Sequence, residues 1–460
     1  MIFLQNTTII GEIKMYKSLK KRTLLLFILV VATLTGCGSS VSVNAESSSS
    51  NLISETESTI PIPVEVFDPA ASPEPYPVED AEKAQTLESF STEPAFEEYD
   101  ITLMALGDNL IHMGVVHTGK QTDGSLNYNF LFDGISDFLN KADIKIINQE
   151  TPLAGNELGF HGYPNFNSPT EIGDAIVDAG FNVVLHASNH SADQGISGLD
   201  SCVTFWRNYP EVLLTGIHEP VENPEIPLLT IKDKTFAILN YTYGPNYGSA
   251  PENLASRMNV LCNIDPANRQ IDFTTLNPQV IEDIKEAEQI ADMVIVCPHW
   301  GTEYATTPSN YQENFAKQMT EAGADVIIGT HPHVVQPVSL IEADNGNTSL
   351  CYYSLGNYVS TQKNGQSMLE GMAWINFHVT ENGISLSLED TGIIPLVCHY
   401  TSGPVRIKNI YLLEDYTEEL ASSHGIINYG GISFHLDHLI GWSEDILGEW
   451  VITADQALNH

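Results

Sequence analysis

Hydrophobic runs alternate with helical periodicity from about residue 99 to residue 348 of this chain. The short apolar runs are typical of strands buried on both faces of a parallel sheet, and the segments between them carry apolar residues at helical spacing. The strands predicted in this way cover residues 101–106, 143–147, 181–185, 212–214, 236–239, 293–297 and 326–328. The predicted helices cover residues 131–142, 171–179, 199–209, 278–291 and 311–322. Strands that alternate with helices predict an α/β fold.

The pattern changes after residue 348. Residues 350–353, 372–379 and 384–388 are strand-like with few helical segments between them, which predicts a mostly antiparallel second sheet that completes a sandwich. Beyond about residue 410 the sequence is polar and weakly periodic. The folded domain is therefore expected to span residues 99–410, and residues 411–460 are a C-terminal extension without an assigned role.

The N-terminus has the pattern of a secretory signal. A basic segment over residues 14–22 precedes an apolar run over residues 23–33, which is short for a membrane span. Leu-Thr-Gly-Cys follows at residues 34–37 and resembles a bacterial lipobox. Residues 1–36 are therefore predicted to be a lipoprotein signal peptide, and Cys37 the lipidated first residue of the mature protein. The alternative is a signal-anchor helix that stays uncleaved.

Residues 37–98 are rich in Ser, Pro and Glu, a composition that buries too little apolar surface to order itself. They are predicted to form a disordered tether on the extracellular face of the membrane of a Gram-positive-like bacterium, although a specific docking arm is the alternative. The chain carries a formal net charge of −40, and loss of residues 1–36, which carry +4, leaves −44. This charge argues against nucleic acid as a partner and favours cations nearby.

Five cysteines follow Cys37, at positions 202, 262, 297, 351 and 398. Their odd number and the lack of Cys-x-x-Cys spacing predict neither a disulfide framework nor a thiolate zinc site. Cys297 and Cys351 lie inside apolar runs and are predicted to be small core residues.

Residues that can bind a metal follow five of the predicted strands. They are Asp108, Glu150, the pair Asn189 and His190, His299, and the pair His331 and His333. Each alone is equally well explained as a polar loop residue, but five groups at five strand ends favour a site along one edge of the sheet. In an extended His331-Pro332-His333 loop, alternate residues project to the same side, so both imidazoles can reach one centre.

Carboxylate, amide and imidazole groups are the ligand set for one or two divalent ions of borderline to hard character. Two neighbouring ions need a bridging carboxylate, and Glu150 is the candidate because it stands at its own strand end. The ion is expected to be Mn, Zn or Fe.

Six short motifs, taken in order, carry a resemblance to a known family. They are Gly-Asp (107–108), Asn-Gln-Glu-Thr (148–151), Ser-Asn-His (188–190), His-Trp-Gly (299–301), Gly-Thr-His-Pro-His (329–333) and Ser-Leu-Gly-Asn (354–357). Together they resemble the CapA-type poly-γ-glutamate capsule biosynthesis proteins (PGA_cap domain), a branch of the calcineurin-like metallophosphatase superfamily. The resemblance covers about residues 100–410. It implies a four-layer αββα metallophosphatase-like sandwich with a two-metal site at the strand ends.

Carried over by motif, the resemblance implies two groups of metal ligands that share Glu150. The first group is Asp108, Glu150 and His333, and the second is Glu150, Asn189, His299 and His331. His190 is implied to be the general acid that protonates the leaving group. Two positions depart from the superfamily pattern, because Leu110 stands where a histidine is usual and the bridging residue is Glu rather than Asp. The first metal is therefore expected to have only three ligands from the protein.

Two functions of different classes stay open. The first is a surface-anchored, metal-dependent hydrolase that acts on a phosphoester or on the amide backbone of poly-γ-glutamate in capsule synthesis or processing. The second is a non-catalytic, metal-containing scaffold that binds the anionic γ-glutamyl polymer within a capsule synthesis or export complex. The negative charge of the chain opposes direct binding of a polyanion, and metal ions in the binding groove relieve that repulsion.

Overall fold

The computed structural model describes residues 96–246, 250–429 and 431–459. The described part from Phe96 onward forms one compact unit. The predicted signal peptide, the predicted lipidation site Cys37 and nearly all of the predicted tether lie outside the described residues. Among the residues that are described, no helix is both long enough and apolar enough to cross a bilayer.

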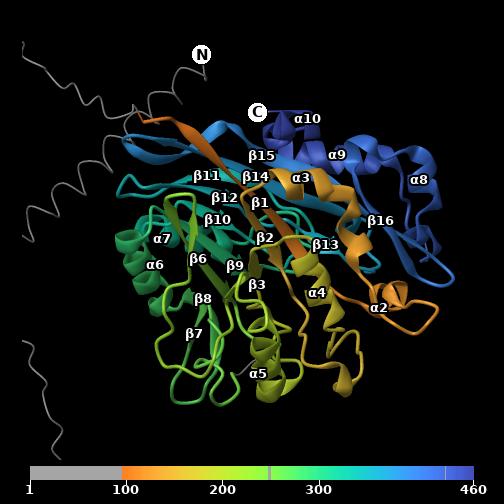
Figure 1. Ribbon diagram of the computed structural model, residues 1–460, viewed down its shortest axis with the longest axis horizontal. Coiled ribbons are helices and arrows are strands. Elements are labelled where there is room, and N and C mark those ends of the chain that lie inside the picture. The colour runs from red at the N-terminus through yellow and green to blue at the C-terminus, as the bar shows by residue number, and fades with distance from the viewer. Residues whose placement is uncertain (1–95, 247–249, 430, 460) are drawn as a thin grey trace, which may run out of the picture. The chain divides into compact units, whose positions relative to one another are not determined.

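An eight-stranded sheet forms one layer of strands (Figure 1). Its order is β16 (Arg406–Leu412), β15 (Gly383–Thr401), β14 (Leu369–Thr380), β1 (Tyr99–Asn109), β2 (Ile144–Asn148), β3 (Val183–Leu185) and β4 (Leu213–Thr215), and β13 (Asn357–Val359) also pairs with β1. The strands from β1 to β4 are parallel, and the strands from β14 to β16 are antiparallel. The carboxyl ends of β1, β2 and β3 therefore lie at the same edge.

A six-stranded sheet forms the second layer of strands. Its order is β11 (Val338–Glu342), β12 (Thr348–Tyr352), β10 (Val326–Ile328), β9 (Met293–His299), β6 (Lys234–Thr242) and β5 (Leu228–Ile231). The four central strands are parallel, and the two edge strands are antiparallel to their neighbours. A separate hairpin consists of β7 (Cys262–Ile264) and β8 (Ile271–Leu276).

The two sheets pack face to face through one large hydrophobic core. Phe236 of β6 contacts Phe377 of β14 across the interface, with ring centroids 5.4 Å apart. A second core lies between the outer face of the six-stranded sheet and the helices α6 (Pro278–Ile290) and α7 (Asn310–Ala322). Cys297 and Cys351 are buried in these two cores, as predicted, and the five described cysteines are free.

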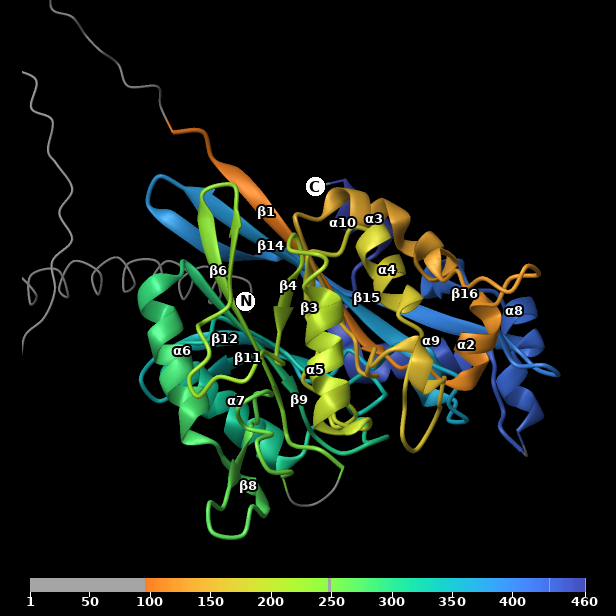
Figure 2. The same ribbon diagram turned by 60° about the horizontal axis from the view of Figure 1, so that its bottom comes forward.

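Helices also cover the eight-stranded sheet. They include α3 (Ser136–Lys141), α4 (Glu171–Asp178) and α5 (Gly195–Trp206), whose apolar side chains enter the large core. In both views, α6 and α7 lie on the opposite side of the sheets from α4 and α5 (Figures 1 and 2). The order of layers is helix, sheet, sheet, helix, which confirms the expected four-layer αββα sandwich.

The remaining described helical segments belong to loops and to the C-terminal part of the chain. They are α2 (Met113–Gly119), α8 (Glu418–Ser423), α9 (Leu436–Leu447) and α10 (Ala454–Leu458), with the 3-10 turns η1 (Asn129–Ile135), η2 (Asn156–Leu158), η3 (Gln366–Met368), η4 (Leu413–Asp415), η5 (Gly425–Asn428) and η6 (Gly448–Trp450). Buried residues of α9 and α10 pack into the same large core as the sheets. The segment from η4 onward therefore belongs to the same compact unit.

The strands after residue 348 do not form a second sheet of their own, so that prediction is wrong. β12 joins the six-stranded sheet parallel to β10, whereas β14, β15 and β16 extend the eight-stranded sheet beside β1. β1 pairs with β2 along one edge. The hydrogen-bonding groups of its other edge are satisfied by β14. Periodicity shows that a segment is a strand, but it carries no information about which strand it pairs with.

One predicted helix also differs from the structure. The predicted helix over residues 131–142 is a 3-10 turn, η1, followed by the short helix α3. Gly134 lies inside this segment, and glycine has low helix propensity because it loses more backbone freedom than other residues.

Candidate metal centre

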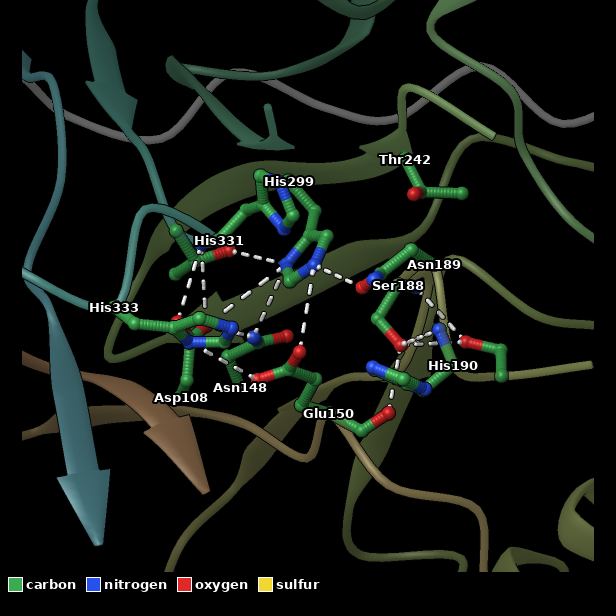
Figure 3. Close-up of polar contacts among 12 residues, drawn as sticks. Asp108, Asn148, Glu150, Ser188, Asn189, His190, Thr242, His299, His331 and His333 are labelled. Carbon is green, nitrogen blue, oxygen red and sulfur yellow. Dashed lines mark hydrogen bonds and ion pairs between the residues drawn. The ribbon is translucent and has the colours of Figure 1, made fainter. Parts of the chain in front are cut away.

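The six predicted metal ligands lie together at the carboxyl ends of strands from both sheets (Figure 3). Asp108 is in β1, Glu150 follows β2, Asn189 follows β3, His299 ends β9, and His331 and His333 follow β10. All six side chains are buried. Segments far apart in the sequence therefore converge because parallel strands end at one edge of each sheet.

The first group of the centre contains Asp108, Glu150 and His333, whose ligand atoms lie within 4.8 Å of one another. His333 Nδ1 is 3.1 Å from Asp108 Oδ2 and 3.8 Å from Glu150 Oε2. Burial lowers the pKa of His333, but the carboxylates of Glu150 and Asp108 raise it more strongly, to about 9. This group can hold one divalent ion.

The second group contains Glu150, His299 and His331 within the same limit. His299 Nε2 is 3.9 Å from Glu150 Oε1 and 2.8 Å from Asn189 Oδ1, which brings the amide oxygen into the group. Burial and the neighbouring histidines lower the pKa of His299 and His331 well below the usual value. Both rings are therefore neutral, which is the form of imidazole that binds a metal.

Glu150 lies between the two groups, with one oxygen toward His299 and the other toward His333. Both oxygens are buried without a hydrogen-bond partner, and so is Nδ1 of His331. Burial and the charge of Asp108 raise the pKa of Glu150 well above its usual value. A buried carboxylate without a partner is costly, and divalent cations on its two sides remove that cost. The residues present therefore fit two metal ions that share Glu150.

Neighbouring polar groups hold the ligands in place. Asn148 Nδ2 donates to Asp108 Oδ1 at 2.7 Å, and Thr330 Oγ1 lies 3.0 Å from His299 Nδ1. Asn189 Nδ2 donates to Asn246 Oδ1 at 3.0 Å, which leaves the amide oxygen of Asn189 on the side of His299. Such outer contacts fix the orientation of metal ligands in proteins.

The His331-Pro332-His333 loop is not extended, so that part of the prediction is wrong. The backbone φ angles of His331 and His333 are 97° and 59°, in the left-handed region that non-glycine residues rarely adopt. As a result the two rings, whose centroids are 5.7 Å apart, face different groups on the two sides of Glu150 rather than one centre. Backbone strain of this kind is typical of functional sites.

His190 lies beside the second group and belongs to neither group of candidate ligands (Figure 3). Its Nδ1 is 2.7 Å from Asp193 Oδ2, which also accepts a hydrogen bond from the backbone N–H of Phe166 at 2.8 Å. The edge of the Phe166 ring packs against the imidazole, with centroids 4.7 Å apart. These contacts fix the plane of the ring and leave Nε2 free for a ligand.

Several residues of the site were not found from the sequence. Asn148 belongs to the Asn-Gln-Glu-Thr motif but was given no role, and Asp193 lies three positions after His190. The signal for both is a hydrogen-bonding side chain within three positions of a predicted site residue. Asn246 and the aromatic residues Tyr243 and Tyr304 come from loops after β6 and β9 and carry no such signal. The ring centroid of Tyr243 lies 4.8 Å from that of His331, and the ring centroid of Tyr304 lies 6.0 Å from that of His333.

A family model described as "Bacterial capsule synthesis protein PGA_cap" matches residues 102–362, more than half of the chain. The chain belongs to the PGA_cap family. This confirms the expected resemblance to the CapA-type proteins. Leu110 lies within the matched segment and is 2% exposed.

Two curated proteins are similar to this PGA_cap protein. The PGA biosynthesis protein CapA of Bacillus subtilis (strain 168) is 30% identical over 269 residues, which cover 57% of this chain and 63% of the relative. The capsule biosynthesis protein CapA of Bacillus anthracis is 26% identical over 299 residues, which cover 63% of this chain and 66% of the relative. The chain thus spans slightly less than two thirds of the length of these relatives.

Solved structures show more distant likeness. The calcineurin-like phosphoesterase YfkN from Bacillus subtilis is 12% identical, with a TM-score of 0.35 over 76% of this chain and 97% of that chain. The TT1561 protein of Thermus thermophilus is 7% identical, with a TM-score of 0.29 over 63% of this chain and 99% of that chain.

Proposed function

We propose that this PGA_cap protein is a metal-dependent hydrolase of the metallophosphoesterase type that works in capsule synthesis or processing. The observation that carries the proposal is the position of Glu150, whose two unpartnered oxygens face two separate groups of buried ligands. Divalent ions bound there supply Lewis-acid activation of water and stabilise negative charge on a phosphoryl or acyl oxygen.

His190 is the proposed general acid. Asp193 accepts the hydrogen bond from Nδ1, so Nε2 is the ring atom that carries a proton to a leaving oxygen. The proposed substrate is a phosphoester or the amide backbone of poly-γ-glutamate, the polymer to which "PGA" in the family name and in the name of the Bacillus subtilis relative points.

A second function is favoured by one feature of the site. Leu110 supplies no ligand to the first group, and an ion held there by few ligands suits binding better than catalysis. In this alternative the protein is a scaffold of a capsule synthesis or export complex, and its metal ions bind the carboxylates of the anionic γ-glutamyl polymer. The net charge of −40 opposes contact with a polyanion, and such cations would relieve that repulsion.

Two histidine substitutions distinguish the hydrolase from the scaffold. In a phosphodiester assay of the purified protein with Mn²⁺, we expect His190→Ala to lower kcat about 10²–10⁴-fold, because the leaving group loses its proton donor. Metal content, measured by elemental analysis, should stay unchanged in this variant. His299→Ala should lose metal and activity together, and the exposed His378→Ala serves as a control with no effect on either.

The assay is paired with measurement of capsule output in cells. The hydrolase proposal is contradicted if His190→Ala cells form capsule at the level of the parent while His299→Ala cells form none. That outcome would support the scaffold.

A further inference from the structure

The Ser-Leu-Gly-Asn motif has no role in the proposed chemistry, yet it ends inside the metal centre. Asn357 begins β13, which pairs in parallel with β1, and the register places Asn357 directly beside Asp108. The turn that leads there has Gly356 at a φ of 70°. The Asn357 side chain is completely buried.

Hydrogen bonds determine which way the Asn357 amide points. Its nitrogen lies 3.0–3.3 Å from four oxygens, the backbone carbonyls of His333 and Ser367, Ser360 Oγ and Gln362 Oε1. A carbonyl oxygen can only accept a hydrogen bond, so the nitrogen must face this side. The amide oxygen is therefore directed at His333 Nδ1, 3.1 Å away.

His333 Nδ1 thus has two oxygen neighbours at the same distance, because Asp108 Oδ2 also lies 3.1 Å away. An imidazole nitrogen carries at most one proton and cannot fully satisfy two acceptors. Ligand atoms at right angles around an ion, with bonds of about 2.1 Å, lie about 3 Å apart. Both distances from His333 Nδ1, to Asp108 Oδ2 and to Asn357 Oδ1, are therefore those of neighbouring ligands of one ion.

We propose that Asn357 Oδ1 is a ligand of the first metal, together with Asp108, Glu150 and His333. Asn357 thereby supplies the fourth protein ligand that Leu110 cannot provide. Three of the four ligand atoms are then oxygens, which favours Mn²⁺ over Zn²⁺ in the first position, whereas the two histidines of the second group accept either ion. This inference rests on the metal centre of the proposed function, but it does not depend on hydrolysis.

The test counts bound Mn²⁺ in the purified full chain by titration calorimetry and elemental analysis, without substrate. The wild-type chain should bind two ions. Asn357→Ala should keep one ion and bind the other at least about tenfold more weakly, because loss of a supporting residue at a metal site already weakens metal binding by about that factor. Asn376→Ala removes a buried asparagine of the neighbouring strand β14 and should bind two ions like the wild type.

Asn357→Asp separates a ligand from a residue that only holds the loop. It keeps an oxygen at the ligand position but places a second oxygen against the four oxygens that now accept from the amide. A ligand role predicts that two Mn²⁺ ions still bind, whereas a purely structural role predicts loss of the first ion. This variant also decides the question if Asn357→Ala does not fold.

Two results would overturn the inference: wild-type affinity for both ions in Asn357→Ala, or fewer than two ions in the wild-type chain. If the first ion is lost in Asn357→Ala and kept in Asn357→Asp while no hydrolysis is found, the inference stands and the hydrolase proposal fails.

Discussion

At the scale of single residues, the side chains around a buried carboxyl group decide whether it can bind a metal. Glu150 and Glu370 are both completely buried with unpartnered oxygens. Burial and the charge of Asp108 raise the pKa of both groups well above the usual value. Of these two acids, Glu150 has imidazoles on two sides, whereas Glu370 belongs to no group of candidate ligands within the described residues. We therefore interpret Glu370 as a neutral, protonated acid and Glu150 as a bridging carboxylate.

The contact between β1 and β13 depends on the missing side chain of Gly107. A Cβ atom at Gly107 would lie 2.0 Å from the carbonyl oxygen of Gly356, so β13 would have to move away from β1. We expect Gly107→Ala to lower the free energy of unfolding by about 1–3 kcal/mol, as overpacked sites do, and to weaken the first metal site. Chemical denaturation and Mn²⁺ counting measure the two effects.

Gly441→Ala in α9 is the matched control. A Cβ atom there meets open space, and alanine is favoured over glycine in helices, so stability should stay equal or rise by up to about 1 kcal/mol. Wild-type stability together with two bound ions in Gly107→Ala would contradict the prediction, because β13 could then move away from β1 without cost.

At the scale of elements, the C-terminal segment is joined to β15 by buried histidines. His399 of β15 pairs through Nδ1 with the hydroxyl of Tyr416 at 2.7 Å. His424, the N-cap of η5, accepts from the N–H of Ile426 through Nδ1 and pairs through Nε2 with the carbonyl of Cys398. The two rings pack with centroids 4.7 Å apart. His424 must stay neutral for this arrangement because its Nδ1 accepts a hydrogen bond, and burial of both rings makes the docking of the segment sensitive to acid.

Stability should therefore fall as the pH is lowered from 7 to 5. Burial lowers the pKa of His424 to about 3 and that of His399 to about 4, to which the charge of Lys408 also contributes. The unfolded chain takes up protons below about pH 6.5, whereas the folded chain does not, so acid favours unfolding. We expect a loss of about 1–2 kcal/mol per histidine over this range, measured by urea unfolding at each pH.

Replacement of one histidine isolates its share of the pH effect. His424→Gln should lower stability at pH 7 but reduce the further loss on going to pH 5. His378→Gln is the control, because hydrogen bonding to Asp100 raises the pKa of that exposed histidine and its replacement should not reduce the loss. Parallel pH profiles for the wild type and His424→Gln would refute the assignment.

At the scale of the whole molecule, the metal centre exists because two sheets meet. The eight-stranded sheet supplies Asp108 and Glu150, and the six-stranded sheet supplies His299 and the two histidines after β10. Neither sheet alone brings the carboxylate and imidazole groups of the candidate ligands together. Loss of packing between the sheets should therefore abolish metal binding even where each strand persists.

The proposed place of work is the outer face of the cell membrane, which rests on the Leu-Thr-Gly-Cys sequence before a strongly acidic chain. Cys37→Ser removes the thiol that would carry the lipid. We expect the variant to be released into the medium or to remain as an unprocessed precursor, as detected by fractionation and immunoblotting. Retention of a fully processed Cys37→Ser protein at the membrane would rule out the lipid anchor.

The sequence by itself determined most of the elements and the identity of the predicted ligands. Apolar runs and helical spacing are local properties, so β1, β2, β3, β4, β6, β9 and β10 were located within a few residues, whereas β5, β7 and β8 were not predicted. Ligand-type side chains that directly follow strands can also be recognised in the sequence, which is why Asp108, Glu150 and His299 could be predicted to lie together at the candidate site. The order of motifs was enough to name the family.

Only the tertiary structure decided which strands pair, which way the candidate ligand side chains face and which further residues lie beside them. The edge that β14 joins depends on which backbone groups are left unpaired after the other strands have formed, and the sequence does not encode this locally. The sides to which His331 and His333 turn depend on positive φ angles that the surrounding contacts impose. Asn357 is 249 residues from Asp108 in the chain, so only the pairing of β13 with β1 shows that its amide oxygen faces the first metal position.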